Sequence, residues 1–106
     1  MMPEELSRLD LKAAAFLAKA LSDENRLQII LSLAEGKKSV SRIVADLNIS
    51  QPLASHHLKE LKRALMVNVE RSGPFIYYEL ADSRIMSILV DLNSLAKDLL
   101  ANRTTF

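Results

Sequence analysis

Apolar residues recur at three- and four-residue steps in three long stretches of the chain, a spacing that predicts helices with one buried face. The first predicted helix covers residues 6–21. The second follows Ser22, a suitable N-cap residue, and ends at Gly36, as helices often end at glycine. The last covers residues 83–101.

The middle of the chain predicts two shorter helices joined by a tight turn. Ser39 begins the third helix, and Ser50 caps the fourth, which has Pro52 in its first turn, where a missing N–H costs nothing. Between these helices, Asn48 tolerates the left-handed backbone of a sharp corner. So short a connection forces the helices to cross steeply, which predicts a helix-turn-helix.

After residue 65 the apolar spacing changes from 3.6 residues to two. Apolar residues alternate with polar ones over residues 67–69 and 76–80, on either side of Ser72-Gly73-Pro74, which predicts a β-hairpin. The chain has 106 residues, 49% of them hydrophobic, a size typical of one domain. We therefore predict a single domain over residues 1–106, mostly α with five helices and a small β-hairpin.

The fourth helix has two contrasting faces. Ala54, Leu58, Leu61 and Leu65 lie within about 60° of one another and form its predicted core stripe. Short polar and basic side chains occupy the opposite side and its edge: Gln51, Pro52, Ser55, His56, Lys59, Lys62 and Arg63. Such a face suits the DNA major groove, because glutamine, serine and histidine hydrogen-bond base edges while lysine and arginine neutralise phosphates.

The charge distribution supports an anionic partner for this segment. Residues 37–71 carry seven basic and three acidic side chains, although the net charge of the chain is only +1. Arg71, beside the predicted hairpin turn, is placed for a groove or phosphate contact. His57 lies at the margin of the core stripe. Two interpretations of it stay open, a packed and hydrogen-bonded histidine or a phosphate contact, and we include it among the predicted DNA contacts.

The first and last helices have more apolar residues than a small core can cover. In the last helix Met86, Val90 and Leu100 lie outside the main stripe. This surplus predicts a partner surface, most economically a second copy of the chain, although both helices packing on their own chain is the alternative. The predicted dimer contacts are Leu9, Ala13, Phe16, Leu17, Ile88, Leu92, Leu95 and Leu99.

Several classes of function lack their required residues. The chain has no cysteine, which excludes thiolate metal sites, disulfides and thiol redox switches. We predict no enzyme, because nucleophile elbows, phosphate-binding loops and metal-spaced histidines are absent. His56 and His57 point about 100° apart on a helix and cannot chelate one ion together. No apolar run reaches the roughly 18 residues of a membrane span, and we expect a cytoplasmic protein without a membrane partner.

Three segments resemble the ArsR/SmtB family of repressors, and the resemblance extends over about residues 12–98. They are Leu21-Ser22-Asp23-Glu24-Asn25-Arg26-Leu27, Ile49 through Leu61 with the Ser-Gln-Pro and Ser-x-His-Leu elements, and Tyr77-Tyr78-Glu79-Leu80. The resemblance implies a winged helix-turn-helix homodimer, joined through its first and last helices, that binds an inverted repeat in double-stranded DNA. It implies recognition through Gln51, Ser55 and His56 and a wing contact near Arg71.

The metal sites that the resemblance brings with it are absent. Ser39 and Ser41 replace a Cys-x-Cys pair, and Val44 replaces a further cysteine. The zinc positions of the last helix correspond to Asp82, Arg84, Leu95 and Asp98, a poor transition-metal set. The glycine usual after the recognition helix corresponds to Leu65. We predict no cofactor and no metal ligand, and the effector is unknown.

We therefore predict a sequence-specific DNA-binding transcriptional regulator, a repressor on the strength of the resemblance, acting as a homodimer. A winged-helix module that binds other proteins without DNA is the main alternative. An oxygen-ligand metal sensor built across the dimer from Asp82, Asp91 or Asp98 is a third hypothesis.

Overall fold

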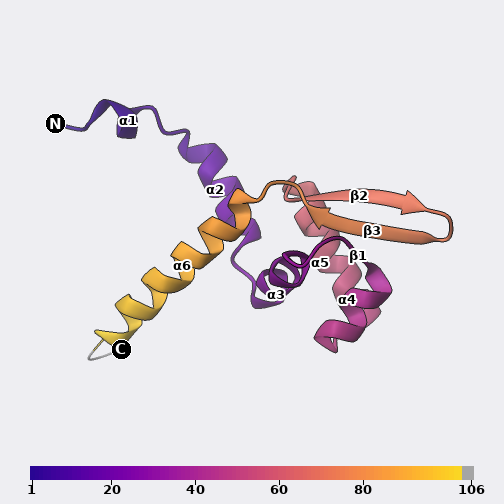
Figure 1. The fold of residues 1–106 in the computed structure, drawn as a ribbon. Coiled ribbons are helices and arrows are strands. Elements are labelled where there is room, and N and C mark those ends of the chain that lie inside the picture. The colour runs from indigo at the N-terminus through magenta and orange to yellow at the C-terminus, as the bar shows by residue number, and fades with distance from the viewer. Residues whose placement is uncertain (104–106) are drawn as a thin grey trace.

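The computed structural model describes residues 1–103, and within them the chain forms six helices and a three-stranded antiparallel sheet of order β1-β3-β2 (Figure 1). The elements are α1 (Glu4–Ser7), α2 (Leu11–Ala20), α3 (Glu24–Leu33), β1 (Lys38–Ser39), α4 (Val40–Leu47), α5 (Gln51–Arg63), β2 (Val67–Ser72), β3 (Phe75–Leu80) and α6 (Arg84–Ala101). The predicted mostly α fold with a helix-turn-helix and a hairpin is confirmed. Residues 104–106 of the predicted domain lie outside the described residues.

The first helix differs from its prediction. Instead of one helix over residues 6–21, the chain forms the short α1 and then α2, so that six helices replace the expected five. The Asp10 carboxylate accepts a hydrogen bond of 3.0 Å from the Ala13 N–H and thereby caps α2. Because aspartate offers the backbone this alternative to continued helix, the helix restarts at Leu11. α1 has no buried residue and lies at the end of an arm (Figure 1).

The N-cap of α3 is Asp23 and not the predicted Ser22. The Asp23 carboxylate accepts hydrogen bonds from the N–H groups of Asn25, at 2.8 Å, and Arg26, at 3.3 Å. Ser22 serves the preceding helix, since its hydroxyl donates to the Lys19 carbonyl at 2.6 Å. A carboxylate is the stronger acceptor for the positive end of a helix, which explains why the cap moves by one residue.

The corner between α4 and α5 forms as predicted. Ser39 caps α4 by accepting a hydrogen bond from the Arg42 N–H, and Ser50 caps α5 through the Leu53 N–H, each at 3.2 Å. Asn48 ends α4 in the left-handed conformation, with φ of 52°. Pro52 lies in the first turn of α5. These local preferences agree with one another and fix the crossing of the two helices.

The end of α5 corrects the predicted core stripe. Ala54, Leu58 and Leu61 are buried as expected, but Leu65 is 77% exposed and left-handed, with φ of 63°. The Met66 N–H donates to the Leu61 carbonyl, and the Leu65 N–H to the Lys62 carbonyl, each at 3.0 Å. This is the Schellman pattern, in which the residue after the cap is usually glycine. Leu65 takes the backbone conformation that glycine favours, and Met66 becomes buried.

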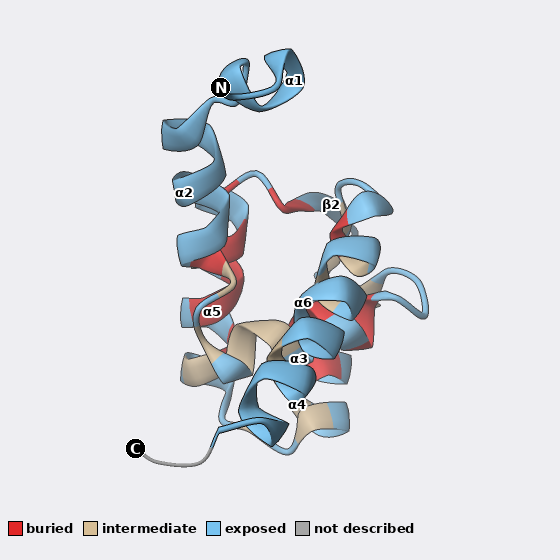
Figure 2. Cartoon of the chain, turned by 90° about the vertical axis from the view of Figure 1, so that its left-hand side faces the viewer, coloured by how far each residue is buried: buried red, intermediate tan, exposed pale blue. Residues whose placement is uncertain are grey.

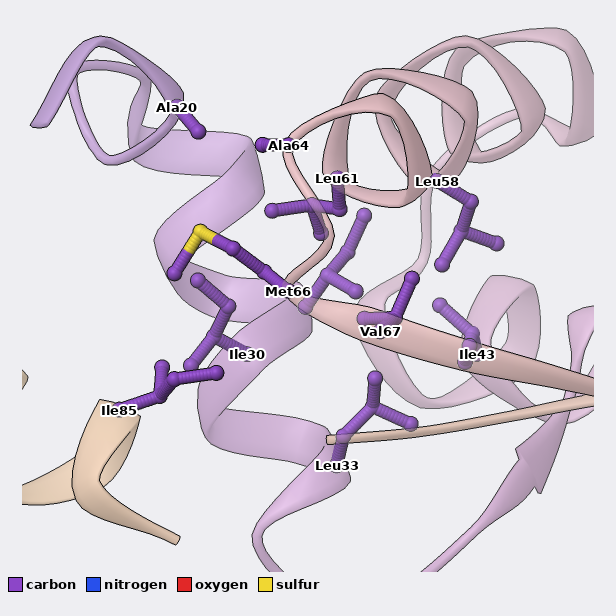
Figure 3. Packing of buried hydrophobic residues seen from close by; sticks show 11 residues of the cluster. Ala20, Ile30, Leu33, Ile43, Leu58, Leu61, Ala64, Met66, Val67 and Ile85 are labelled. Atoms are coloured by element: carbon purple, nitrogen blue, oxygen red, sulfur yellow. The ribbon is translucent and has the colours of Figure 1, made fainter. Parts of the chain in front are cut away.

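The core lies among α3, α4, α5, the start of β2 and the first turn of α6 (Figure 3). Its fully buried large side chains are Ile29, Ile30, Ile43, Leu58 and Leu61. On α3, Ile29 and Leu33 are buried, whereas Leu31 is 59% exposed. The reason is that α3 contacts α4 and α5 as well as β3 and α6, so neighbours on more than one side select its buried residues.

Helices α2 and α6 contribute little to this core. Within residues 1–103, Ala20 is the single buried residue of α2 and Ile85 that of α6. Most of both helices is exposed (Figure 2). No described helix is both long enough and apolar enough to cross a membrane.

Candidate nucleic-acid interface

The outer face of α5 is exposed along its whole length. The buried residues Ala54, His57, Leu58 and Leu61 hold the opposite side of the helix against the core. Their burial turns a polar and basic set outward: Gln51, Pro52, Ser55, His56, Lys59, Lys62 and Arg63 are all exposed. The predicted contact face therefore lies on one accessible side of a single helix.

His57 differs from this set. It is 5% exposed, its Nδ1 lies 3.5 Å from Nη1 of Arg26, and its Nε2 lies 3.7 Å from the Asp23 carboxylate. A side chain enclosed in this way does not reach a ligand on the outer face. The structure thus contradicts the prediction of a DNA contact through His57 and favours the packed, hydrogen-bonded interpretation. His56 is exposed, as expected for the outer face.

The wing is the hairpin of β2 and β3, in which Val67 pairs with Leu80 and Ser72 with Phe75. Gly73 has φ of 60° and makes the turn with Pro74. Arg71 is opposite Ile76, and side chains alternate across a strand, so Arg71 shares its face with Val67, which packs in the core. Arg71 therefore lies near the turn of the hairpin. Its side chain is on the face of β2 that, at Val67, packs against the core.

A groove of about 430 Å³ separates the wing from the starts of α4 and α5. It brings together two of the predicted contact residues, Gln51 and Ser55, with residues of both neighbouring elements. The lining residues are Ser39, Val40, Ser41, Gln51, Ser55, Pro74, Phe75, Ile76 and Tyr78. Residues separated by some twenty positions in sequence thus form one concave surface beside the exposed face of α5.

Ion pairs divide the basic residues of the middle segment into two groups. Lys37 pairs with Glu70 at 2.7 Å, Arg42 with Asp46 at 2.9 Å and Arg63 with Glu60 at 3.0 Å. Lys59, Lys62 and Arg71 form no ion pair with any residue of the described range 1–103. The unneutralised positive charge is therefore carried by α5 and the end of the wing. Sequence reasoning missed this division because the net charge of a segment does not show which of its cations pair with its three acidic residues, Asp46, Glu60 and Glu70.

Lys38 is the most enclosed of the paired cations. Its ammonium donates to Ser32 at 2.9 Å, Glu35 at 2.7 Å and Asp46 at 2.8 Å, and its side chain is 11% exposed. The hydrogen bond to Asp46, followed by that to Glu35, raises the pKa of Lys38, and the same bond lowers the pKa of Asp46. Lys38 thus joins α3 and α4 and supports the helix-turn-helix from behind.

The carboxylates proposed as alternative metal ligands do not converge within the chain. Asp82 is engaged by Arg84, whose guanidinium donates to it at 2.8 Å. Hydrogen bonds from the Arg84 side chain and then from its backbone N–H lower the pKa of Asp82 to about 2. Across residues 1–103 no three His, Cys, Asp or Glu side chains are grouped so that they could hold a metal ion.

Comparison with known proteins finds one family model and many relatives. The model of the arsR family of bacterial regulatory proteins matches residues 23–69. The HTH-type transcriptional repressor SmtB of Mycobacterium tuberculosis is 43% identical over 81 residues, which are 76% of this chain and 60% of that protein. An uncharacterized HTH-type transcriptional regulator of Methanocaldococcus jannaschii is 39% identical over 77 residues, 72% of this chain and 86% of that protein.

Solved structures have the same fold. The solution structure of a homodimeric winged helix-turn-helix DNA-binding domain from Mycobacterium bovis, described as a possible ArsR-family regulator, superposes with a TM-score of 0.76 at 25% identity. The match covers 100% of this chain and 96% of that one. The chain spans about 60% of the length of SmtB.

Proposed function

The chain belongs to the arsR family of bacterial regulatory proteins, and from this premise we propose that it is a transcriptional regulator that binds duplex DNA as a homodimer. The observation that carries the proposal is the exposed face of α5, which holds unpaired cations and lies beside the groove and the wing. A helix of this kind, packed on the core by one side and exposed along the other, fits the major groove.

The outer residues of α5 take two roles in this proposal. Gln51, Ser55 and His56 lie in the first half of the helix and hydrogen-bond base edges, with Pro52 packed beside them. Lys59, Lys62 and Arg63 follow in the second half and neutralise phosphates. Arg71 contacts the minor groove or a phosphate from the wing. His57 is not part of the proposed set.

The homodimer follows from apolar surface that one chain leaves uncovered. Among the predicted contact residues, the exposed fractions are 54% for Phe16, 52% for Ile88 and 56% for Leu95. All eight are exposed in the single chain: Leu9, Ala13, Phe16, Leu17, Ile88, Leu92, Leu95 and Leu99. A second copy covers such a surface with the fewest assumptions. Two-fold symmetry then pairs the α5 helices on an inverted repeat, about one helical turn of DNA or a multiple of it apart.

We further propose repression as the output, because the relative SmtB is named a repressor. A repressor of this kind acts where the DNA is, which in a bacterium or archaeon is the cytoplasm. The chain is cysteine-free, so an effector that needs a thiolate ligand is excluded from the proposal.

The test begins with selection of bound sequences from a random duplex pool. We expect an inverted repeat to be enriched. In the variant with Ser55→Ala and His56→Ala, discrimination between the selected site and random DNA should fall by about 1–3 kcal/mol per lost base contact, while weak non-specific binding remains. Lys59→Gln should instead weaken binding to all sequences and reduce the salt slope by about one unit.

Lys97→Gln on α6 is the matched control for charge, because it removes one exposed cation away from α5 and should leave the salt slope unchanged. If the Ser55/His56 variant selects the same site as the parent with equal discrimination, the assigned reading face is wrong. If the parent shows no salt-dependent binding to any duplex, the regulator proposal fails and the protein-docking alternative is favoured.

A further inference from the structure

Arg26 of α3 connects two helices to which the proposed function gives different tasks. Its Nε donates to the Ala20 carbonyl at 2.7 Å, and its Nη2 donates to the Lys19 carbonyl at 3.2 Å. These carbonyls lie at the C-terminal end of α2, where a cation is favourable. Its Nη1 lies 3.5 Å from Nδ1 of His57, in the middle of α5. A single guanidinium thus spans α2 and α5.

His57 completes this contact from the side of α5. The ring is enclosed, and its second nitrogen, Nε2, lies 3.7 Å from the Asp23 carboxylate that caps α3. The arrangement fits the neutral tautomer with its proton on Nε2, in which Nδ1 faces the guanidinium and Nε2–H faces the carboxylate. We call Asp23, Arg26 and His57, with the carbonyls of Lys19 and Ala20, the Arg26 cluster.

The cluster restrains the rotation of α5 more specifically than the apolar core does. Burial of Ala54, Leu58 and Leu61 is non-directional, whereas hydrogen bonds depend on direction and distance. Adjacent residues on a helix differ by about 100°, so the direction of the His57 ring also determines where Ser55 and His56 point. A change in the cluster therefore changes the direction of the reading face.

We propose that Arg26 is a positioning residue that sets the orientation of α5 relative to α2. The inference rests on the proposed function, in which α2 lies in the dimer interface and α5 reads DNA. The cluster then fixes the separation of the two α5 helices across the dimer, and with it the spacing of half-sites that the protein accepts. Bivalent binding gains affinity when both sites are engaged together, and it loses that gain when the geometry is wrong.

The first experiment needs no DNA. Because the chain is cysteine-free, Lys59→Cys gives one spin-label position per protomer, and pulsed electron spin resonance reports the label-to-label distance in the dimer. We expect a narrow distribution for the parent and a clearly broader or shifted one after Arg26→Gln. Lys38→Gln is the matched control: it also removes an enclosed cation with three hydrogen bonds, but these join α3 and α4 and not α2. Its distribution should stay narrow.

The second experiment uses DNA and the chain without the label. Affinity is measured for the selected inverted repeat, for repeats with one or two base pairs added or removed, and for a single half-site. Arg26→Gln should weaken binding to the full repeat by about 10-fold and reduce discrimination among spacings, while half-site affinity stays within about twofold. His57→Gln should keep the affinity and the spacing preference of the parent, because an amide can accept a hydrogen bond from Arg26 and donate one to Asp23. His57→Leu should lose both, because leucine has no polar atom to contact Arg26.

Three results would overturn the proposal. One is an Arg26→Gln distance distribution and spacing preference equal to those of the parent. Another is an Arg26→Gln variant whose affinity falls equally for the half-site and the full repeat, which a merely structural role predicts. The third is a labelled parent chain that gives no label-to-label distance, which would show that it forms no dimer. If Arg26→Gln does not fold, His57→Leu carries both measurements. A parent with a narrow distance distribution that selects no DNA refutes the proposed function and leaves the positioning role intact.

Discussion

The central part of the molecule and its terminal helices bury their apolar residues to very different extents. Helix α5 has 13 residues and buries four of them, whereas α6 has 18 residues and buries one, Ile85. Both helices are amphipathic in sequence, so the difference does not come from the pattern of residues. It comes from the neighbours that each helix meets: α5 contacts α3, α4 and β2, whereas α6 contacts mainly α3.

This difference separates two kinds of stability. The central core, formed by α3, α4, α5 and the sheet, is closed within one chain. The apolar stripes of α2 and α6 gain burial only when another surface covers them. Substitutions in the first region should therefore act at every protein concentration, and those in the second should act through association.

Ile43→Ala should give the largest effect. Ile43 is 0% exposed in the central core, and its truncation leaves a cavity that should cost about 2–5 kcal/mol of unfolding free energy. Urea denaturation followed by circular dichroism measures the loss, which should be the same at low and high protein concentration. Ile88→Ala on α6 is the matched comparison, since Ile88 is 52% exposed in the single chain. The unfolding free energy lost in Ile88→Ala should grow with protein concentration. Equal losses at both sites, independent of concentration, would refute the distinction between the closed core and the uncovered helices.

Leu92→Glu should have the next largest effect, and it should appear as dissociation. Leu92 is 44% exposed and belongs to the α6 stripe, where an added carboxylate would be buried against the partner without a counter-charge. We expect the dimer Kd to rise about 100-fold, equivalent to about 2.7 kcal/mol, with the secondary structure kept. Sedimentation velocity measures it. Asn93→Glu, whose side chain points about 100° away from that of Leu92, should leave the dimer intact, and equal dissociation by both would exclude a defined interface.

Leu65→Gly should be stabilising, an unusual result for the loss of a whole side chain. Leu65 holds a left-handed backbone, which costs a non-glycine residue about 1–2 kcal/mol, and its exposed side chain forfeits little in one chain. Glycine also loses more backbone entropy on folding, so the net gain should be about 0.5–1 kcal/mol in thermal or urea unfolding. Gly73→Ala, at φ of 60° with open space around it, should lower the unfolding free energy by a similar amount. A stability loss in Leu65→Gly would show that Leu65 is covered in the dimer.

The smallest effect concerns the start of α6. The pKa of Asp82 is lowered to about 2, mainly by the Arg84 guanidinium. Arg84→Gln should raise this pKa toward the ordinary 3.8, with the backbone hydrogen bond from residue 84 preserving part of the shift. Because the folded-state pKa is depressed, the pair favours folding above about pH 4 and loses that contribution as the pH falls toward 2. Carbon-13 NMR titration measures the value, and an unchanged pKa would assign the shift to the backbone bond.

The sequence predicted the parts of the site that depend on near neighbours. The caps Ser39 and Ser50, the left-handed corner at Asn48 and the outward side of α5 each depend on residues within about four positions, so their pattern is visible in the chain itself. The hairpin was predicted for the same reason, since its strands are joined by a two-residue turn. The assignment of the outer α5 residues to DNA contacts stays a prediction until the binding experiments are done.

Other features depended on contacts between distant residues. The burial of His57 and its approach to Arg26 join positions 31 residues apart, and the pairing of Lys37 with Glu70 joins positions 33 apart. The periodicity of α5 placed His57 only at the margin of the apolar stripe, so packing by α3 decided whether it was inside or outside. The same holds for Leu65, which lies beyond the end of α5 in the left-handed conformation and is exposed.

The sequence by itself determined most of the helices, the β-hairpin, the place of the helix-turn-helix corner and the polar side of α5, because backbone hydrogen bonding and side-chain periodicity act over a few residues. The tertiary structure alone decided which cations remain unpaired, which histidine is enclosed and which apolar stripes stay uncovered. These properties depend on what each side chain meets across the fold, and a desolvated or ion-paired group differs from a solvated one by its neighbours and not by its identity.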